Sequence, residues 1–143
     1  MIVERLFVDT SFLLAVMNKN DQEHQRARTL LPRVGRAKLV LTTEAVLVEV
    51  GNAFGRNHRG LGSQLIEQYL DDSRDPESGV EVVPIDTRLL RRGLEIYRKH
   101  QDKEWGLTDC ISFVVMREHG LTDALTADRH FVQAGFRALM REA

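Results

Sequence analysis

Four acidic residues stand out because their types and positions could hold divalent cations: Asp9, Glu49, Asp109 and Asp128. If these carboxylates converge, their mutual repulsion must be relieved, either by raised pKa values or by bound cations. Oxygen-only ligands of this kind suit Mg²⁺ or Mn²⁺. Such ions favour phosphate substrates, because they neutralise phosphate charge, lower the pKa of bound water and stabilise the leaving oxygen. The chemistry expected from the set is therefore metal-assisted phosphodiester hydrolysis.

Two of these acids follow segments that are predicted to be buried strands. Asp9 comes directly after the apolar residues 6–8, and Asp128 follows a short predicted strand at 124–126. Continuous apolar runs are typical of strands that are buried on both faces of a parallel sheet. Ligands of open parallel sheets bind beyond the carboxyl ends of the strands, where the strand order reverses. We therefore expect Asp9 and Asp128 to meet in one crevice.

The other two acids lie on predicted helices. Glu49 is the lone charge among residues 45–50, and helical geometry places it about 100° from the centre of the apolar stripe. An acid in that position must lie on the rim of the core or have a partner. Asp109 opens a helix whose residues 110–116 are nearly all apolar. We expect this helix to pack deeply and to hold Asp109 rigidly beside the sheet.

Helix capping is the competing interpretation for three of the four acids. Asp9, Asp109 and Asp128 each lie where an N-cap or first-turn acid is common, a role that contributes about 1 kcal/mol. For each of these residues taken alone, capping is the more frequent role. No single acid decides between the two interpretations, so the hypothesis of a metal site depends on the set.

Strands alternate with helices along the chain, which predicts an α/β fold around a mostly parallel sheet. The expected strands cover residues 4–8, 38–41, 80–85, 124–126 and 136–140. The expected helices follow residues 9, 43, 86 and 128 and cover residues 21–31, 63–70 and 109–119. Pro32 is expected to end the helix at 21–31, and Thr108 is expected to cap the helix at 109–119. The polar residues 71–79 are predicted to form an exposed connection.

Length and composition place the chain among single-domain globular proteins. Its 143 residues, 43% hydrophobic and 29% charged, suit one domain over residues 1–143. The single cysteine, Cys110, excludes an internal disulfide and favours a reducing, cytoplasmic location. No run approaches the roughly 20 apolar residues of a membrane helix, so no membrane association is expected. The net charge of −1 disfavours a simple nucleic-acid binder, but once four acids are committed to metal the remaining bases outnumber the remaining acids.

The motifs around the four acids resemble those of the PIN-domain nucleases, especially the VapC-type toxins of bacterial toxin–antitoxin pairs. The resemblance runs from one end of the chain to the other, and the order and spacing of the motifs carry it. The matching segments are residues 7–12 (FVDTSF), 21–27 (DQEHQRA), 42–49 (TTEAVLVE), 107–110 (LTDC) and 125–131 (LTADRHF).

This resemblance implies a PIN-like three-layer sandwich, in which helices flank a mostly parallel central sheet. It implies a Mg²⁺- or Mn²⁺-dependent endoribonuclease that leaves 5′-phosphate and 3′-hydroxyl ends, acting as the toxin of a type II toxin–antitoxin system. It also implies an RNA substrate, a homodimer and a small antitoxin protein that blocks the site.

The resemblance also assigns roles to individual residues. Asp9 and Asp109 would be the core metal ligands, and Glu49 and Asp128 would act directly or through water. The residues that would orient these carboxylates or touch the substrate are Thr10, Ser11, Thr108, Thr126, Arg129 and His130.

Two other functions stay open at this point. One is a PIN-like module that binds RNA or protein without cleaving, although binding alone does not need four converging carboxylates. The other is a Mg²⁺ enzyme that acts on small phosphoesters, although Ser11 stands where one large phosphatase group has its second aspartate. Contacts to an RNA backbone and a merely solvated surface explain five basic residues about equally well: Arg56, His58, Arg59, Arg129 and His130.

Overall fold

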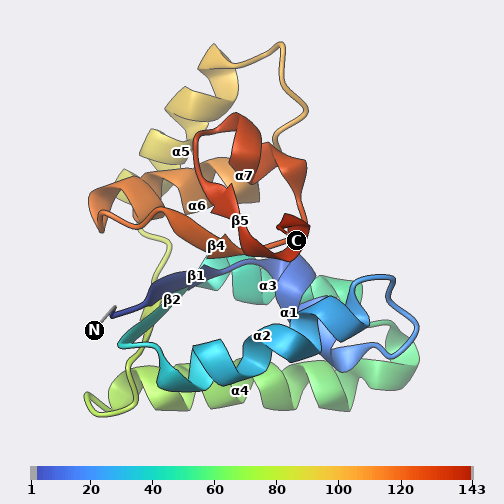
Figure 1. The fold of residues 1–143 in the computed structure, drawn as a ribbon. Helices are drawn as coiled ribbons and strands as arrows, with labels where there is room; N and C mark the ends of the chain where they lie inside the picture. Colours follow the sequence, from blue (N-terminus) through green and yellow to red (C-terminus); the bar gives the residue numbers. More distant parts are fainter. Residues whose placement is uncertain (1–2, 143) are drawn as a thin grey trace.

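A parallel sheet of five strands forms the centre of the protein (Figure 1). The structure is a computed structural model that describes residues 3–142, so residues 1, 2 and 143 of the expected domain lie outside it. The strands lie in the order β3-β2-β1-β4-β5. β2 and β3 are added on one side of β1, whereas β4 and β5 are added on its other side, so the strand order reverses between β1 and β4. The crevice beyond the carboxyl ends of these two strands is therefore the expected position for a ligand. The strands are β1 (Arg5–Val8), β2 (Leu39–Thr43), β3 (Val80–Val83), β4 (Asp123–Leu125) and β5 (Arg137–Ala138).

Seven α-helices lie within the described residues. Helices α5, α6 and α7 cover one side of the sheet, and α1, α2 and α4 cover the other (Figure 1). This arrangement confirms the predicted three-layer α/β sandwich. No helix within residues 3–142 combines the length and the apolar character needed to cross a membrane. The helices are α1 (Thr10–Met17), α2 (His24–Arg36), α3 (Glu44–Ala53), α4 (Arg59–Arg74), α5 (Thr87–Lys99), α6 (Leu107–Glu118) and α7 (Arg129–Gln133).

The core holds the sheet and two helices in fixed positions relative to one another. Residues 6–8 of β1 are fully buried because β1 is the middle strand and helices cover both faces of the sheet. All of residues 110–116 in α6 are buried as well. The ring of Phe113 contacts Trp105 and Phe131 edge-on, with ring centroids 5.1 Å apart in each pair. These aromatic contacts fix α7 against α6.

Helix α2 extends past the proline that was expected to end it. Pro32 lies inside this helix, so that expectation is wrong. Tertiary contacts support the turn beyond the proline: the Arg33 guanidinium pairs with Glu4 at 2.5 Å, and Val34 packs against the core. The helix also begins later than predicted, because the Asp21 carboxylate accepts a hydrogen bond from the Glu23 backbone in a preceding turn.

The start of α6 and the end of α4 also differ from the predictions. Helix α6 begins at Leu107 with Gly106 as its N-cap, so Thr108 does not cap it. The Asp109 carboxylate accepts a hydrogen bond from the Gly106 backbone at 3.1 Å and satisfies a free donor of the first turn. Helix α4 continues to Arg74, so the exposed connection is shorter than the predicted 71–79.

Helices α5 and α6 approach closely at Gly93, where a Cβ atom would lie 2.7 Å from Ile111 Cγ1. Gly93→Ala is therefore expected to lower the free energy of unfolding by about 1–3 kcal/mol, because Ile111 must shift. Urea denaturation measures the change. Gly35→Ala in α2 is the matched control, since a Cβ there meets nothing within 4 Å and alanine favours a helix. Equal stability of the two variants would contradict the close approach.

Candidate active site

Asp9 lies at the carboxyl end of β1, next to the point where the strand order reverses. Its side chain is only 4% exposed, and its Oδ2 atom accepts hydrogen bonds from Thr126 at 2.8 Å and from Ser11 at 3.1 Å. Although Asp9 holds the N-cap position of α1, its side chain makes no capping hydrogen bond. The carboxylate is therefore held in the crevice by hydroxyl groups, and the capping interpretation does not account for it.

The two hydroxyl groups that hold Asp9 also join the start of α1 to the end of β4. Ser11 Oγ and Thr126 Oγ1 lie 3.1 Å apart. Each hydroxyl also accepts a hydrogen bond from the backbone that follows β4. Ala127 N donates to Ser11 Oγ at 3.1 Å, and Asp128 N donates to Thr126 Oγ1 at 3.0 Å. This network fixes the orientation of the Asp9 carboxylate and the position of the chain at Asp128.

Glu49 reaches the same crevice from α3. As predicted, it lies on the rim of the core, where it is exposed. The buried hydroxyl of Thr10 donates to Glu49 Oε1 at 2.5 Å. Because Thr10 directly follows Asp9, this contact brings the Glu49 carboxylate to the carboxyl end of β1. Thr10 thus orients Glu49, while Ser11 and Thr126 orient Asp9.

Asp109, Asp128 and His130 form the other part of the crevice. His130 Nδ1 lies 3.1 Å from Asp109 Oδ2 and 3.2 Å from Asp128 Oδ1. One ligand atom from each of the three residues lies within 4.8 Å of the others, so together they could hold a metal ion. Asp128 also accepts a hydrogen bond from the His130 backbone at 2.9 Å and thereby caps α7. For Asp128, capping and participation in the cluster coexist.

The electrostatics of the crevice show that the four carboxylates influence one another. The pKa of Asp9 is raised to about 7, mainly by burial and in smaller part by the charges of Asp109 and Glu49, while the hydrogen bond from Thr126 opposes the rise. Burial also raises the pKa of Asp109, and the charge of Asp128 adds to the effect. Bound cations would relieve this repulsion, and carboxylate oxygens are ligands that suit Mg²⁺ or Mn²⁺.

Among the described residues of the predicted site, two make no hydrogen bond or ion pair with these carboxylates. Thr108 is half-buried in the first turn of α6, and its backbone carbonyl accepts a hydrogen bond from Ser112 at 3.0 Å. Arg129 is exposed at the start of α7 and lies 4.0 Å from Glu104. The remaining predicted residues meet at the crevice.

The sequence interpretation missed a group of charged residues beside His130. Asp102, Lys103 and Glu104 lie in the loop between α5 and α6 and line a hollow together with residues of α7. The sequence contains a signal for this group, because residues 100–104 are all polar and lie shortly before the helix that carries Asp109.

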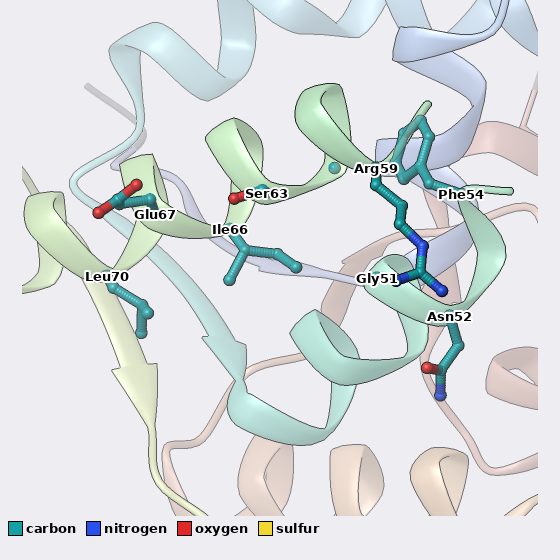
Figure 2. A pocket seen from close by; sticks show the side chains of 9 residues that line it. Gly51, Asn52, Phe54, Arg59, Ser63, Ile66, Glu67 and Leu70 are labelled. Atoms are coloured by element: carbon teal, nitrogen blue, oxygen red, sulfur yellow. The ribbon is translucent and has the colours of Figure 1, made fainter. Parts of the chain in front are cut away.

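A larger hollow lies between α3 and α4 (Figure 2). It has a volume of about 630 Å³, and the side chain of Arg59 extends across it from α4 toward Asn52 on α3 (Figure 2). None of the four predicted metal ligands lines it. Arg59, one of the candidate RNA contacts, therefore faces this hollow.

Comparisons with known proteins agree with the geometry. A family model described as the PIN domain matches residues 6–137. The 23S rRNA-specific endonuclease VapC20 of Mycobacterium tuberculosis, from strains CDC 1551 / Oshkosh and ATCC 25618 / H37Rv, is 29% identical over 133 residues, covering 92% of this chain and 95% of that protein. The crystal structure of Mycobacterium tuberculosis VapC20, described as a sarcin-ricin loop cleaving toxin, has a TM-score of 0.77 at 27% identity. That match covers 92% of this chain and 96% of the other. The chain therefore belongs to the PIN-domain family, and within it is similar to a VapC-type endonuclease toxin.

Proposed function

We propose that the chain, as one domain over residues 1–143, is a Mg²⁺- or Mn²⁺-dependent endoribonuclease that hydrolyses RNA phosphodiester bonds. The observation that carries this proposal is the meeting of four carboxylates at the reversal of strand order, two of them with raised pKa values. Carboxylates that repel one another in a buried crevice are stabilised by divalent cations. Membership of the PIN-domain family and the similarity to VapC20 support RNA as the substrate class.

In the proposed mechanism, Asp9 and Asp109 would be the core metal ligands. Glu49 and Asp128 would complete the ligand set directly or through water. When bound, the cation supplies charge neutralisation at the phosphate and an activated water. The chain fixes the orientation of the ligands before the substrate arrives. Carboxylates that are already fixed lose little entropy when they bind the cation.

The side chains around the acids serve this orientation. Ser11 and Thr126 hold the Asp9 carboxylate through two hydrogen bonds, and Thr10 holds Glu49. His130 lies between Asp109 and Asp128, and its Nδ1 atom is 3.1 Å from Asp109 Oδ2 and 3.2 Å from Asp128 Oδ1. Each acid therefore has at least one neighbour that fixes its position.

Cleavage of ribosomal RNA in the presence and absence of metal tests the proposal. The protein is expected to cut RNA with Mg²⁺ or Mn²⁺, to lose this activity in EDTA, and to regain it when either cation is restored. The products are expected to carry 5′-phosphate and 3′-hydroxyl ends, which end-labelling measures. Cleavage that survives EDTA would contradict the metal-dependent mechanism. Metal-dependent binding of RNA without cleavage would favour the non-cleaving alternative.

We further propose that the chain acts as a toxin, forms a homodimer and is held inactive by a small antitoxin protein. The similarity to VapC20, which is described as a toxin, supports this proposal. A gene for a small DNA-binding protein beside the gene for this chain, together with co-purification of the two products, is the expected observation. Light scattering measures the molar mass in solution, which should be twice that of one chain if the protein is a homodimer.

A further inference from the structure

A hollow of about 240 Å³ adjoins the acidic cluster on the side of α7. Six residues line this hollow, which we call the α7 pocket: Asp102, Lys103, Glu104, Arg129, His130 and Gln133. His130 belongs to both places, because its Nδ1 atom contacts Asp109 and Asp128 while its side chain also lines the pocket. A group bound in the α7 pocket would therefore lie next to the phosphate held at the acids.

The wall of the α7 pocket is anchored by Trp105. This residue is only 8% exposed, and its indole Nε1 donates to Gln133 Oε1 at 2.9 Å. Its ring also packs edge-on against Phe113 of α6 and against His100, with centroids 5.1 Å and 5.0 Å away. The loop of residues 100–106 is thus tied to α6 and to α7, so the pocket is preformed.

The charges in the α7 pocket are only loosely paired. The Arg129 guanidinium lies 4.0 Å from Glu104, and Lys103 Nζ lies 3.6 Å from Asp102. Exposed pairs at these separations contribute little. A phosphate group at hydrogen-bond distance would bind the guanidinium more strongly than Glu104 does at 4.0 Å, because two of its oxygens can accept two parallel N–H donors. The cations are therefore available to an anionic ligand.

We propose, on the basis of the RNA cleavage proposed above, that the α7 pocket receives the RNA nucleotide adjoining the cleaved phosphodiester. Arg129 and Lys103 bind the phosphate of this nucleotide, and Glu104 leaves Arg129 when the RNA arrives. Trp105 is a positioning residue that acts through the loop and Gln133. His130 lines the pocket and also contacts Asp109 and Asp128, so RNA bound in the pocket lies beside the acids.

Steady-state kinetics of Arg129→Ala test this assignment, with the RNA that is cleaved fastest in the experiment above as the probe. Loss of one charged phosphate contact is expected to raise KM about tenfold and to leave kcat within about twofold. The slope of log KM against log salt concentration should fall by about 0.7, the value for one phosphate of a single strand. Arg28→Ala is the matched control, because Arg28 is an exposed arginine of α2, on the other side of the sheet (Figure 1).

Two further variants separate a substrate contact from a structural role. Arg129→Lys is expected to have a KM between those of Arg129→Ala and the unaltered protein, because lysine keeps the charge but not the paired donors. Trp105→Phe keeps an aromatic ring but removes the donor to Gln133, and it should raise KM about threefold at unchanged kcat. Arg129→Ala and Arg28→Ala with the same KM and the same salt slope would overturn the proposal.

The design distinguishes failure of the pocket from failure of the proposed function. If the unaltered protein cleaves RNA but Arg129→Ala does not change KM, only the pocket assignment fails. If the unaltered protein does not cleave RNA, the proposed function fails. In that case, fluorescence anisotropy of labelled ribosomal RNA fragments tests the pocket separately. The pocket assignment holds only if Arg129→Ala binds the fragments more weakly than Arg28→Ala does.

Discussion

Asp9→Asn is expected to reduce RNA cleavage by about 10³-fold, a loss typical of a removed group that stabilises charge in the transition state. The substitution replaces one carboxylate oxygen with an amide nitrogen, so the crevice loses a negative charge at the position that burial and hydrogen bonds hold most firmly. The affinity of the site for the cation should also fall, because a neutral amide is a weaker ligand than a carboxylate. Single-turnover cleavage measures the rate, and a titration with Mn²⁺ measures the affinity.

Asp86→Asn is the matched control for this experiment. Asp86 caps α5 by accepting a hydrogen bond from the Leu89 backbone at 2.7 Å, and asparagine is an equally good N-cap. This variant should therefore cleave RNA like the unaltered protein. If Asp9→Asn cleaves as fast as Asp86→Asn, Asp9 is not a metal ligand and the proposed mechanism is wrong.

The second large effect is a loss of stability with rising pH in the absence of metal. The pKa of Asp9 is about 7 in the folded protein, against an ordinary value of 3.8. Between these values the unfolded chain releases the proton while the folded protein keeps it, so stability falls as pH rises from about 4 to about 7. Above pH 7 the cost is complete and reaches up to about 4 kcal/mol. The raised pKa of Asp109 acts in the same direction.

Urea denaturation in EDTA at pH 5 and pH 8 measures this effect. The unaltered protein should be less stable at pH 8, and Asp9→Asn should show a much smaller difference between the two pH values. Glu4, Glu118 and Glu142 have lowered pKa values, so their contributions are lost only at more acidic pH. Mg²⁺ should restore stability at pH 8, because it binds the folded state. Identical pH dependence in the two proteins would contradict the burial of an ionisable Asp9.

The sequence predicted the sheet and the placement of most of the acids because both follow from local patterns. An apolar run that ends in Asp9 predicts a buried strand with an acid at its carboxyl end, and parallel pairing brings such ends together. The rim position of Glu49 followed from helical periodicity alone. The starts of the helices that follow residues 43 and 86 were also predictable from local patterns, because the Thr43 and Asp86 side chains each accept a capping hydrogen bond.

Other features depend on contacts between distant segments, which local patterns do not contain. The contact between His130 and Asp109 requires the packing of α7 against α6, which the aromatic cluster around Phe113 provides. The continuation of α2 through Pro32 likewise depends on tertiary contacts, here the ion pair of the following arginine with Glu4. The polar residues 100–104 can be recognised in the sequence, but the α7 pocket itself could not be predicted, because it needs this loop and α7 to meet.

The pairing of β1 with β4 also sets the order in which the site is completed during synthesis. Thr126, the hydrogen-bond partner of Asp9, is synthesised 117 residues after it. Until β4 emerges, the nascent chain lacks Thr126 and Asp128 and has only part of the ligand set. A ribonuclease built in this way is therefore expected to stay inactive beside the ribosomal RNA until Thr126 and Asp128 have been synthesised and β4 has paired with β1.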